Sequence, residues 1–254
     1  MTNKLKFGQI KPNLGIPINW GNPLAKGLVG YWPMLEGTGN TVQDLSGNGN
    51  DGNLVADTHW VGGKFGPCLS FDGDEDYVLL PYQNIGTTVT YAFWYKDPIA
   101  TSAVPLAYMG SYAKFYAGGG MRWFPDQGET FTYITWAPPS GWAHFVLTQT
   151  GTNVTVYING AYANSANTTY SINTENLKNQ IGGSGTDWVN GTIDDVMIYN
   201  RALSASEVAE LYRNPFGLFE RDDTALWQSG GGGTPITNQT IPRSSIRNIQ
   251  MSMI

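Results

Sequence analysis

The 254-residue chain contains a single cysteine, little charge and no long hydrophobic run. Cys68 alone cannot form an intrachain disulfide, so a hydrophobic core must hold the fold together. The 14 basic residues are dispersed and the formal net charge is −6, which argues against a nucleic-acid-binding surface. No segment approaches the roughly 18 consecutive apolar residues of a transmembrane helix, so we expect no membrane span.

Targeting signals are also missing from the first residues. MTNKLKFGQIKPNLG (1–15) has two early lysines but lacks the apolar stretch of a secretory signal peptide. We therefore expect a protein that is made in the cytoplasm and has no signal peptide. The single cysteine leaves the redox compartment open.

Glycine and aromatic residues are abundant where charge is scarce. Glycine occurs 32 times and aromatic residues make up 13% of the chain, whereas charged residues, also 13%, reach only about half of ordinary usage. Between residues 28 and 199, short apolar runs recur and are bounded by Gly, Asn, Asp and Pro. This spacing predicts an all-β sandwich or barrel rather than βαβ units.

Two segments show the strand pattern most clearly. WAHFVLTQTGTNVTVYINGAY (142–162) predicts a β-meander with turns at Gly151 and at Asn159–Gly160, because Asn-Gly tolerates the positive φ of a type I′ turn. TVTYAFWYK (88–96) alternates, which predicts a strand with two distinct faces. One face carries Val89, Tyr91, Phe93 and Tyr95, and the other carries Thr90, Ala92, Trp94 and Lys96.

One short helix is predicted at SASEVAELY (204–212). Ser204 and Glu207 have the spacing of a capping box, in which each side chain accepts a hydrogen bond from the other residue's backbone N–H. Val208 and Leu211 give the helix an apolar side, and Pro215 ends it.

The composition divides the chain into three parts. Residues 1–26 are rich in Pro, Gly and Asn and predict an extended arm. Residues 27–219 contain the strand-like runs and form the predicted domain. Residues 220–254 begin as a Gly-rich linker and end in a peptide with several Ile and Met residues, which is either disordered or docked on a partner.

Four segments, in the order of the family, resemble the laminin-G-like, concanavalin A-like jelly-roll domains. They are GLVGYWPMLEGTGNTVQDLSGNGNDGNL (27–54), WVGGKFGPCLSFDGDEDYVLLP (60–81), WAHFVLTQTGTNVTVYINGAY (142–162) and GTIDDVMIYNRALSASEVAELY (191–212). The resemblance implies a two-sheet antiparallel β-sandwich with one concave sheet. It also implies binding of carbohydrate or protein, often with a structural calcium ion, and usually no catalysis.

The flanks of the domain resemble a narrower group. INWGNPLAKGLVGYWPM (18–34) and LYRNPFGLFE (211–220) look like the flanks of laminin-G-like proteins encoded by tailed bacteriophages. This resemblance implies a virion surface protein, such as a capsid decoration, head fibre or tail appendage. We expect such a protein to form a homo-oligomer and to contact other virion proteins through its terminal arms.

Three acidic clusters are candidates for a calcium site, because Ca²⁺ binds carboxylate and carbonyl oxygens. They lie in QDLSGNGNDG (43–52), FDGDEDY (71–77) and TIDDV (192–196). The family resemblance places the calcium ion near the first and third clusters, which here means Asp44, Asp194 and Asp195. The alternative is that Asp44 and Asp51 only make Asx turns and that Asp72 only caps a hairpin.

Asp194 and Asp195 raise a specific question, because they are adjacent in a predicted strand and should point to opposite faces. Val196 and Ile198 have the character of core residues, and regular alternation puts Asp194 on their face. An inward carboxylate is costly unless a cation or several backbone N–H groups compensate its charge. Asp194 is therefore predicted to have one of these partners.

Aromatic rings with nearby polar groups are typical of sugar-binding sites, because sugars stack their apolar faces on rings. The loop-rich middle of the chain and the loop GTDWVNG (185–191) supply such residues. The alternative for each ring is a place in the core. The candidate ligand-binding residues are Tyr112, Arg122, Trp123, Trp136 and Trp188.

The sequence does not predict an enzyme. Glycosidases with this sandwich carry Glu-x-Asp-x-(x)-Glu along one strand, and the chain has no such triplet. Neither His59 nor His144 accompanies a nucleophile motif, and His144 alternates as a packed strand residue would. Three hypotheses remain: a virion surface protein that binds host-surface or mucus glycans, a bacterial carbohydrate-binding module or adhesin, and a glycoside hydrolase.

Overall fold

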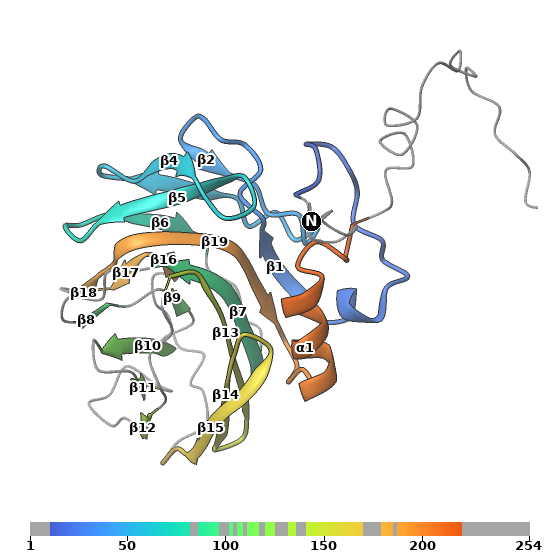
Figure 1. Cartoon of the computed structure of the whole chain (residues 1–254), viewed down its shortest axis with the longest axis vertical. Coiled ribbons are helices and arrows are strands. Elements are labelled where there is room, and N and C mark those ends of the chain that lie inside the picture. Colours follow the sequence, from blue (N-terminus) through green and yellow to red (C-terminus); the bar gives the residue numbers. More distant parts are fainter. Residues whose placement is uncertain are drawn as a thin grey trace, which may run out of the picture. The chain divides into compact units, whose positions relative to one another are not determined.

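Two antiparallel β-sheets pack face to face in the computed structural model, as the sequence predicts (Figure 1). Part of the chain is described, and it belongs to one compact unit, Met1–Glu220. The structure describes residues 11–81, 86–96, 102–103, 106–108, 111–116, 120–124, 132–135, 141–169, 179–184 and 187–219.

The first sheet has the strand order β15-β14-β13-β7-β19-β5-β4, and β1 also pairs with β19. All of these pairings are antiparallel. Its strands are β1 (Leu28–Trp32), β4 (His59–Gly62), β5 (Pro67–Asp72), β7 (Thr88–Lys96), β13 (Ala143–Thr150), β14 (Asn153–Ile158), β15 (Ala161–Asn167) and β19 (Asn190–Tyr199).

The second sheet has the order β12-β11-β10-β9-β16-β6-β3-β2, with β8 paired to β10. Its strands are β2 (Thr41–Val42), β3 (Gly52–Val55), β6 (Tyr77–Leu80), β8 (Ser102–Ala103), β9 (Leu106–Tyr108), β10 (Ser111–Tyr116), β11 (Met121–Phe124), β12 (Thr132–Ile134) and β16 (Asn179–Ile181). The strands β17 (Gly183–Ser184) and β18 (Asp187–Trp188) form a separate pair.

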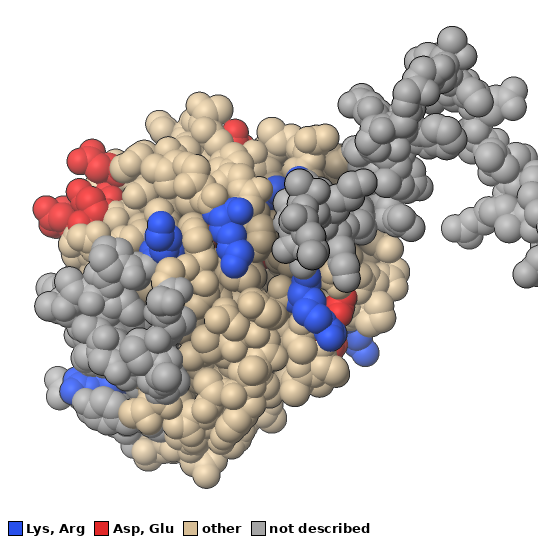
Figure 2. Space-filling model, in the orientation of Figure 1, with Lys and Arg blue, Asp and Glu red and all other residues tan. Residues whose placement is uncertain are grey.

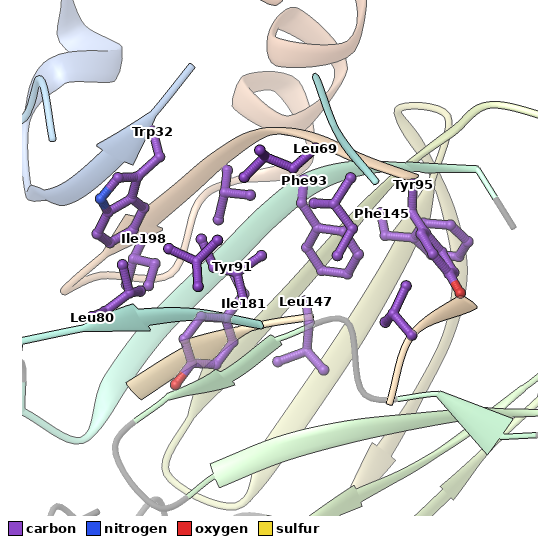
Figure 3. Packing of buried hydrophobic residues seen from close by; sticks show 14 of the residues in the cluster. Trp32, Leu69, Leu80, Tyr91, Phe93, Tyr95, Phe145, Leu147, Ile181 and Ile198 are labelled. Carbon is purple, nitrogen blue, oxygen red and sulfur yellow. The ribbon is translucent and has the colours of Figure 1, made fainter. Parts of the chain in front are cut away.

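The main core lies between the two sheets (Figure 3). The predicted alternation of β7 is confirmed, because Val89, Tyr91, Phe93 and Tyr95 all belong to this core while Ala92 packs on the other face. The ring of Phe93 stacks on that of Phe145 in β13, with 5.9 Å between their centroids. Each such fully buried ring stabilises the fold by about 1.5–3 kcal/mol.

The predicted meander is also confirmed. β13, β14 and β15 pair in sequence, and the last turn has positive φ at both Asn159 (52°) and Gly160 (78°). These values suit the Asn-Gly dipeptide, whose residues tolerate the left-handed region.

A second core lies on the opposite face of the first sheet, beneath the helix α1 (Ala205–Arg213) and the residues before β1. The N-terminal segment enters this core through Ile18, Leu24 and Ala25, the last two in the 3₁₀-helix η1 (Pro23–Ala25). The predicted extended arm, residues 1–26, therefore packs on the domain from its first described residues. Residues 220–254, the predicted linker and docking peptide, lie outside the described residues.

Both flanks of the domain meet at this core. Ile18 forms an antiparallel bridge with Phe219, and the backbone N–H of Asn19 donates to the carbonyl of Leu218 at 2.8 Å. The two segments that carry the narrower family resemblance are thus adjacent in space.

The helix α1 begins as predicted, one residue after Ser204. The Ser204 hydroxyl accepts from the Glu207 N–H, and the Glu207 carboxylate accepts from the Ser204 N–H at 2.8 Å. The hydrogen bond from Arg201, together with these contacts, lowers the pKa of Glu207 to about 2 despite partial burial. Among the described residues, no helix has the length and apolar character needed to cross a membrane.

Candidate functional site

The two adjacent acids of β19 are both buried, with Asp194 0% and Asp195 2% exposed. The register between β19 and β7 shifts between Asp194 and Met197, and Asp195 has a φ of +54°. Because of this β-bulge, Ile193 lies in the main core together with Val196, two residues that regular alternation would separate. The prediction that Asp194 shares the face of Val196 and Ile198 is therefore wrong, because the bulge interrupts the alternation and Asp194 pairs with Trp94 on the other face. Both acids are buried because each face of this sheet is covered by a core.

The positive charge beside Asp194 comes from the N-terminal segment. The ammonium of Lys11 lies 2.6 Å from Asp194 Oδ1, and it also donates to the carbonyls of Met34 (3.0 Å) and Pro67. Burial raises the pKa of Asp194 to about 7, and the charge and hydrogen bond of Lys11 act in the opposite direction. The partner that the sequence requires for Asp194 is thus a lysine.

Asp195 has a different environment. Its Oδ1 accepts a hydrogen bond of 2.9 Å from the Tyr31 hydroxyl in β1. Burial and the neighbouring charge of Asp194 raise the pKa of Asp195 well above its usual range. Burial and the charge of Asp195 raise the pKa of Tyr31 in turn. The pair of carboxyl groups is inaccessible to a substrate, which excludes it as a glycosidase pair.

Asp44 organises its own loop. Its Oδ1 accepts from the backbone N–H groups of Tyr31 and Ser46, and its Oδ2 accepts from the Ser46 hydroxyl and the Asn50 N–H, all at 2.8–2.9 Å. Four donors use the four acceptor sites of a carboxylate. This is the turn-stabilising role that the sequence allowed as an alternative.

The three carboxyl groups do not fit the calcium ion that the family resemblance implies. Asp44 has no free acceptor site, and Asp194 faces an ammonium. Within the part of the chain that the structure describes, no three Asp, Glu, His or Cys side chains gather as metal ligands would.

Of the five predicted ligand-binding residues, Trp123 is a core residue. Its side chain is 1% exposed, lies 5.8 Å from the ring of Tyr91, and donates through Nε1 to Gln149 Oε1 at 2.7 Å. A ring buried in this way has no face for a sugar. Trp123 takes the packing role that the sequence left open for each aromatic residue.

Two other candidates lie on β10 and β11. Arg122 is half-buried on the face of β11 opposite to Trp123, which is the outer face of the second sheet. Tyr112 lies in β10, where its backbone pairs with Phe124, and its side chain is outside the described part of the structure. Trp136 also lies outside the described residues.

Trp188 is half-buried and stacks on Tyr77, with 5.7 Å between the ring centroids and 20° between the planes. The indole also contacts Gly183, since a Cβ built there would lie 2.0 Å from the ring. Glycine is thus required at position 183, and two neighbours fix the indole in place. Sequence reasoning missed Tyr77, although it directly follows the acidic turn.

The pair lies beside the turn that joins β5 to β6. Asn190 of β19 pairs with Asp72 of β5 in the sheet, and the Asn190 side chain packs against Gly73. Asp72, Asp74, Glu75 and Asn190 are all exposed. Acidic side chains gather on this side of the molecule, near the end of β5 (Figure 2). The turn and the stacked pair form what we call the Trp188 site, namely Asp72, Asp74, Glu75, Tyr77, Trp188 and Asn190.

Solved structures with the same fold share little sequence with this chain. The binding domain of Paraclostridial Mosquitocidal Protein 1 is 20% identical with a TM-score of 0.62, over 74% of this chain and 52% of that one. Domain 4 of an extracellular arabinanase from Geobacillus stearothermophilus, solved with arabinotriose, is 19% identical with a TM-score of 0.61, over 73% and 98%. The binding domain of Botulinum neurotoxin DC is 14% identical with a TM-score of 0.58, over 74% and 52%.

The chain thus spans about half the length of the two toxin binding domains that it resembles. No curated protein matches it by sequence. A sequence model of the concanavalin A-like lectin/glucanases superfamily matches residues 72–209, which is more than half of the chain and includes β7, β13 and β19. Together with the two-sheet sandwich, this match shows that the chain belongs to the concanavalin A-like lectin/glucanases superfamily.

Proposed function

We propose that this chain is a non-enzymatic binding domain that holds a neutral glycan at the Trp188 site. The observation that carries the proposal is the half-buried indole of Trp188, stacked on Tyr77 beside exposed polar side chains. Sugars bind to such rings through their C–H faces, while polar groups bind their hydroxyls. Because Tyr77 and Gly183 already fix the ring, little conformational entropy is lost when a ligand stacks on it.

The charge of the site indicates the kind of glycan. Asp72, Asp74 and Glu75 are carboxylates that accept hydrogen bonds from hydroxyls and repel a second anion. Asn190 adds an amide that can donate. These groups favour a neutral or amino sugar over a sialylated or uronic acid-containing glycan.

Three of the structural relatives support a binding role. The arabinanase domain was solved with arabinotriose, and the toxin domains are binding domains, one of them solved with a sialyl ligand. Catalysis has no comparable support, because the adjacent acids Asp194 and Asp195 are buried and His144 is 3% exposed between packed rings. A glycoside hydrolase would need a carboxylate pair over an accessible cleft.

Replacement of Trp188 by alanine is expected to weaken glycan binding about tenfold or more, because the stacking surface is lost. A glycan array with the intact protein would identify the ligand, and calorimetric titration would then give the dissociation constants. Trp20→Ala is the matched control, since Trp20 is 56% exposed and lies outside the Trp188 site. Loss of binding in Trp20→Ala but not in Trp188→Ala would show that the site is elsewhere.

We further propose that the domain is a surface protein of a bacteriophage virion, a capsid decoration, head fibre or tail appendage that binds host-surface or mucus glycans. The resemblance of both flanks to phage proteins supports this, and so does their adjacency through Ile18 and Phe219. We expect a homo-oligomer that is made in the host cytoplasm and attached to other virion proteins. Residues 1–10 and 220–254, the parts of the two terminal arms outside the described residues, are the candidates for this attachment.

Mass spectrometry of purified virions from cells that express the chain tests this assignment. The chain is expected among the structural proteins, in a copy number that matches a symmetric position on the particle. Its absence from the particles, combined with glycan binding, would favour the bacterial carbohydrate-binding module or adhesin instead.

A further inference from the structure

We propose that the ammonium group of Lys11 serves as the structural cation of this domain, so that the N-terminal segment replaces a bound calcium ion. The acids that a cation must neutralise are Asp194 and Asp195, both buried in β19. Lys11 is 183 residues away from Asp194 in the sequence and lies against it in the structure.

The ammonium has a complete set of oxygen partners. Its three N–H donors meet Asp194 Oδ1 at 2.6 Å, the carbonyl of Met34 at 3.0 Å and the carbonyl of Pro67. These oxygens come from β19, from the residues after β1 and from the start of β5. One lysine therefore joins three separate segments of the chain, as a metal ion with carboxylate and carbonyl ligands would.

The site is closed to water. The Lys11 side chain is 6% exposed and that of Asp194 is 0% exposed. The aliphatic part of Lys11 packs against Gly66, where a Cβ would lie 3.3 Å from its Cδ. An ion pair without solvent is screened little, and removal of one partner leaves an uncompensated charge in the interior.

Asp194 Oδ1 is already paired with the ammonium of Lys11. Ca²⁺ needs six to eight oxygen ligands at about 2.3–2.6 Å, and a cation at Asp194 would have to displace the ammonium. Asp44, the third acid of the expected calcium site, is saturated by the N–H groups of Tyr31, Ser46 and Asn50 and by the Ser46 hydroxyl. Lys11, the first described residue of the chain, thus supplies the positive charge that the family resemblance assigns to a calcium ion.

Thermal unfolding of the full chain tests the proposal. For the unchanged protein, neither excess EDTA nor millimolar CaCl₂ is expected to shift the Tm, because a ligand stabilises a fold only if it binds the native state. Lys11→Met is expected to lower the Tm by about 10 °C, since it leaves Asp194 unpaired. The double variant Lys11→Met/Asp194→Asn removes both charges and is expected to recover part of this loss.

Lys26→Met is the matched control, because Lys26 is exposed, and it is expected to melt like the unchanged protein. A fall in Tm on addition of EDTA to the unchanged protein would overturn the proposal, and so would a Lys11→Met variant that melts like the control. If Lys11→Met does not fold, the double variant decides: its recovery as folded protein supports the proposal, and its failure refutes it.

Discussion

Replacement of Trp123 by alanine is expected to lower the free energy of unfolding by about 3–5 kcal/mol. The side chain is 1% exposed within the main core and packs against Tyr91, so its loss leaves a large cavity between the sheets. The substitution also removes the donor that Gln149 Oε1 accepts from at 2.7 Å, and Gln149 is itself 0% exposed. Urea denaturation followed by tryptophan fluorescence or circular dichroism measures this loss.

Two variants separate packing from ligand binding. Trp123→Phe keeps an aromatic ring and should lose less stability than Trp123→Ala, while Trp188→Ala should lose little stability but most of the glycan affinity. If Trp123→Ala instead keeps its stability to within about 1 kcal/mol and loses only ligand binding, the ring is not a core residue in solution.

The stability of the domain is expected to contain an acid-labile contribution from His144. Burial, together with the charge of Lys64, lowers the pKa of His144 to about 3. The unfolded chain binds a proton on this histidine near pH 6.5, whereas the folded protein does not, so protonation favours unfolding. The contribution of neutral His144 to the free energy of unfolding is fully present above about pH 6.5. This contribution is lost as the pH falls toward 3, by about 3 kcal/mol between pH 7 and pH 4.

The variant His144→Gln isolates this contribution. Its free energy of unfolding, measured from pH 7 to pH 4, should fall less steeply than that of the unchanged protein. His59→Gln is the control, because His59 is exposed and is the other histidine of the chain. Parallel curves for His144→Gln and the unchanged protein would contradict the prediction. Asp194 and Asp195, whose pKa values are raised, favour folding at lower pH and affect all three proteins alike.

The features that the sequence predicts well are those decided by neighbouring residues. The two faces of β7, the positive φ values at Asn159–Gly160 and the cap of α1 at Ser204 all depend on local spacing. Each is confirmed, because the period of a strand and the chemistry of a turn or cap act over a few residues.

The features that the sequence misses depend on distant contacts. The β-bulge at Asp195 lies where β19 pairs with β7 and where Asp195 contacts Tyr31 of β1, and no local sequence pattern predicts it. The ion pair between Lys11 and Asp194 forms only when the N-terminal segment has packed on the domain. The burial of Trp123 is likewise decided by the partner sheet. For the proposed ligand site, the sequence singled out Trp188 through its polar loop but not Tyr77, on whose ring Trp188 stacks.

The position of β19 has a mechanical consequence. Its first residue, Asn190, follows Trp188 by two positions, and its last, Tyr199, pairs with Leu28 close to where the two flanks meet. A pulling force between a ligand held at Trp188 and an anchor at either flank would thus act along this strand of about 30 Å. A force along that axis loads all the hydrogen bonds between β19 and its neighbouring strands at the same time, in shear, rather than breaking them one after another. The domain can therefore transmit tension along β19 without unfolding strand by strand.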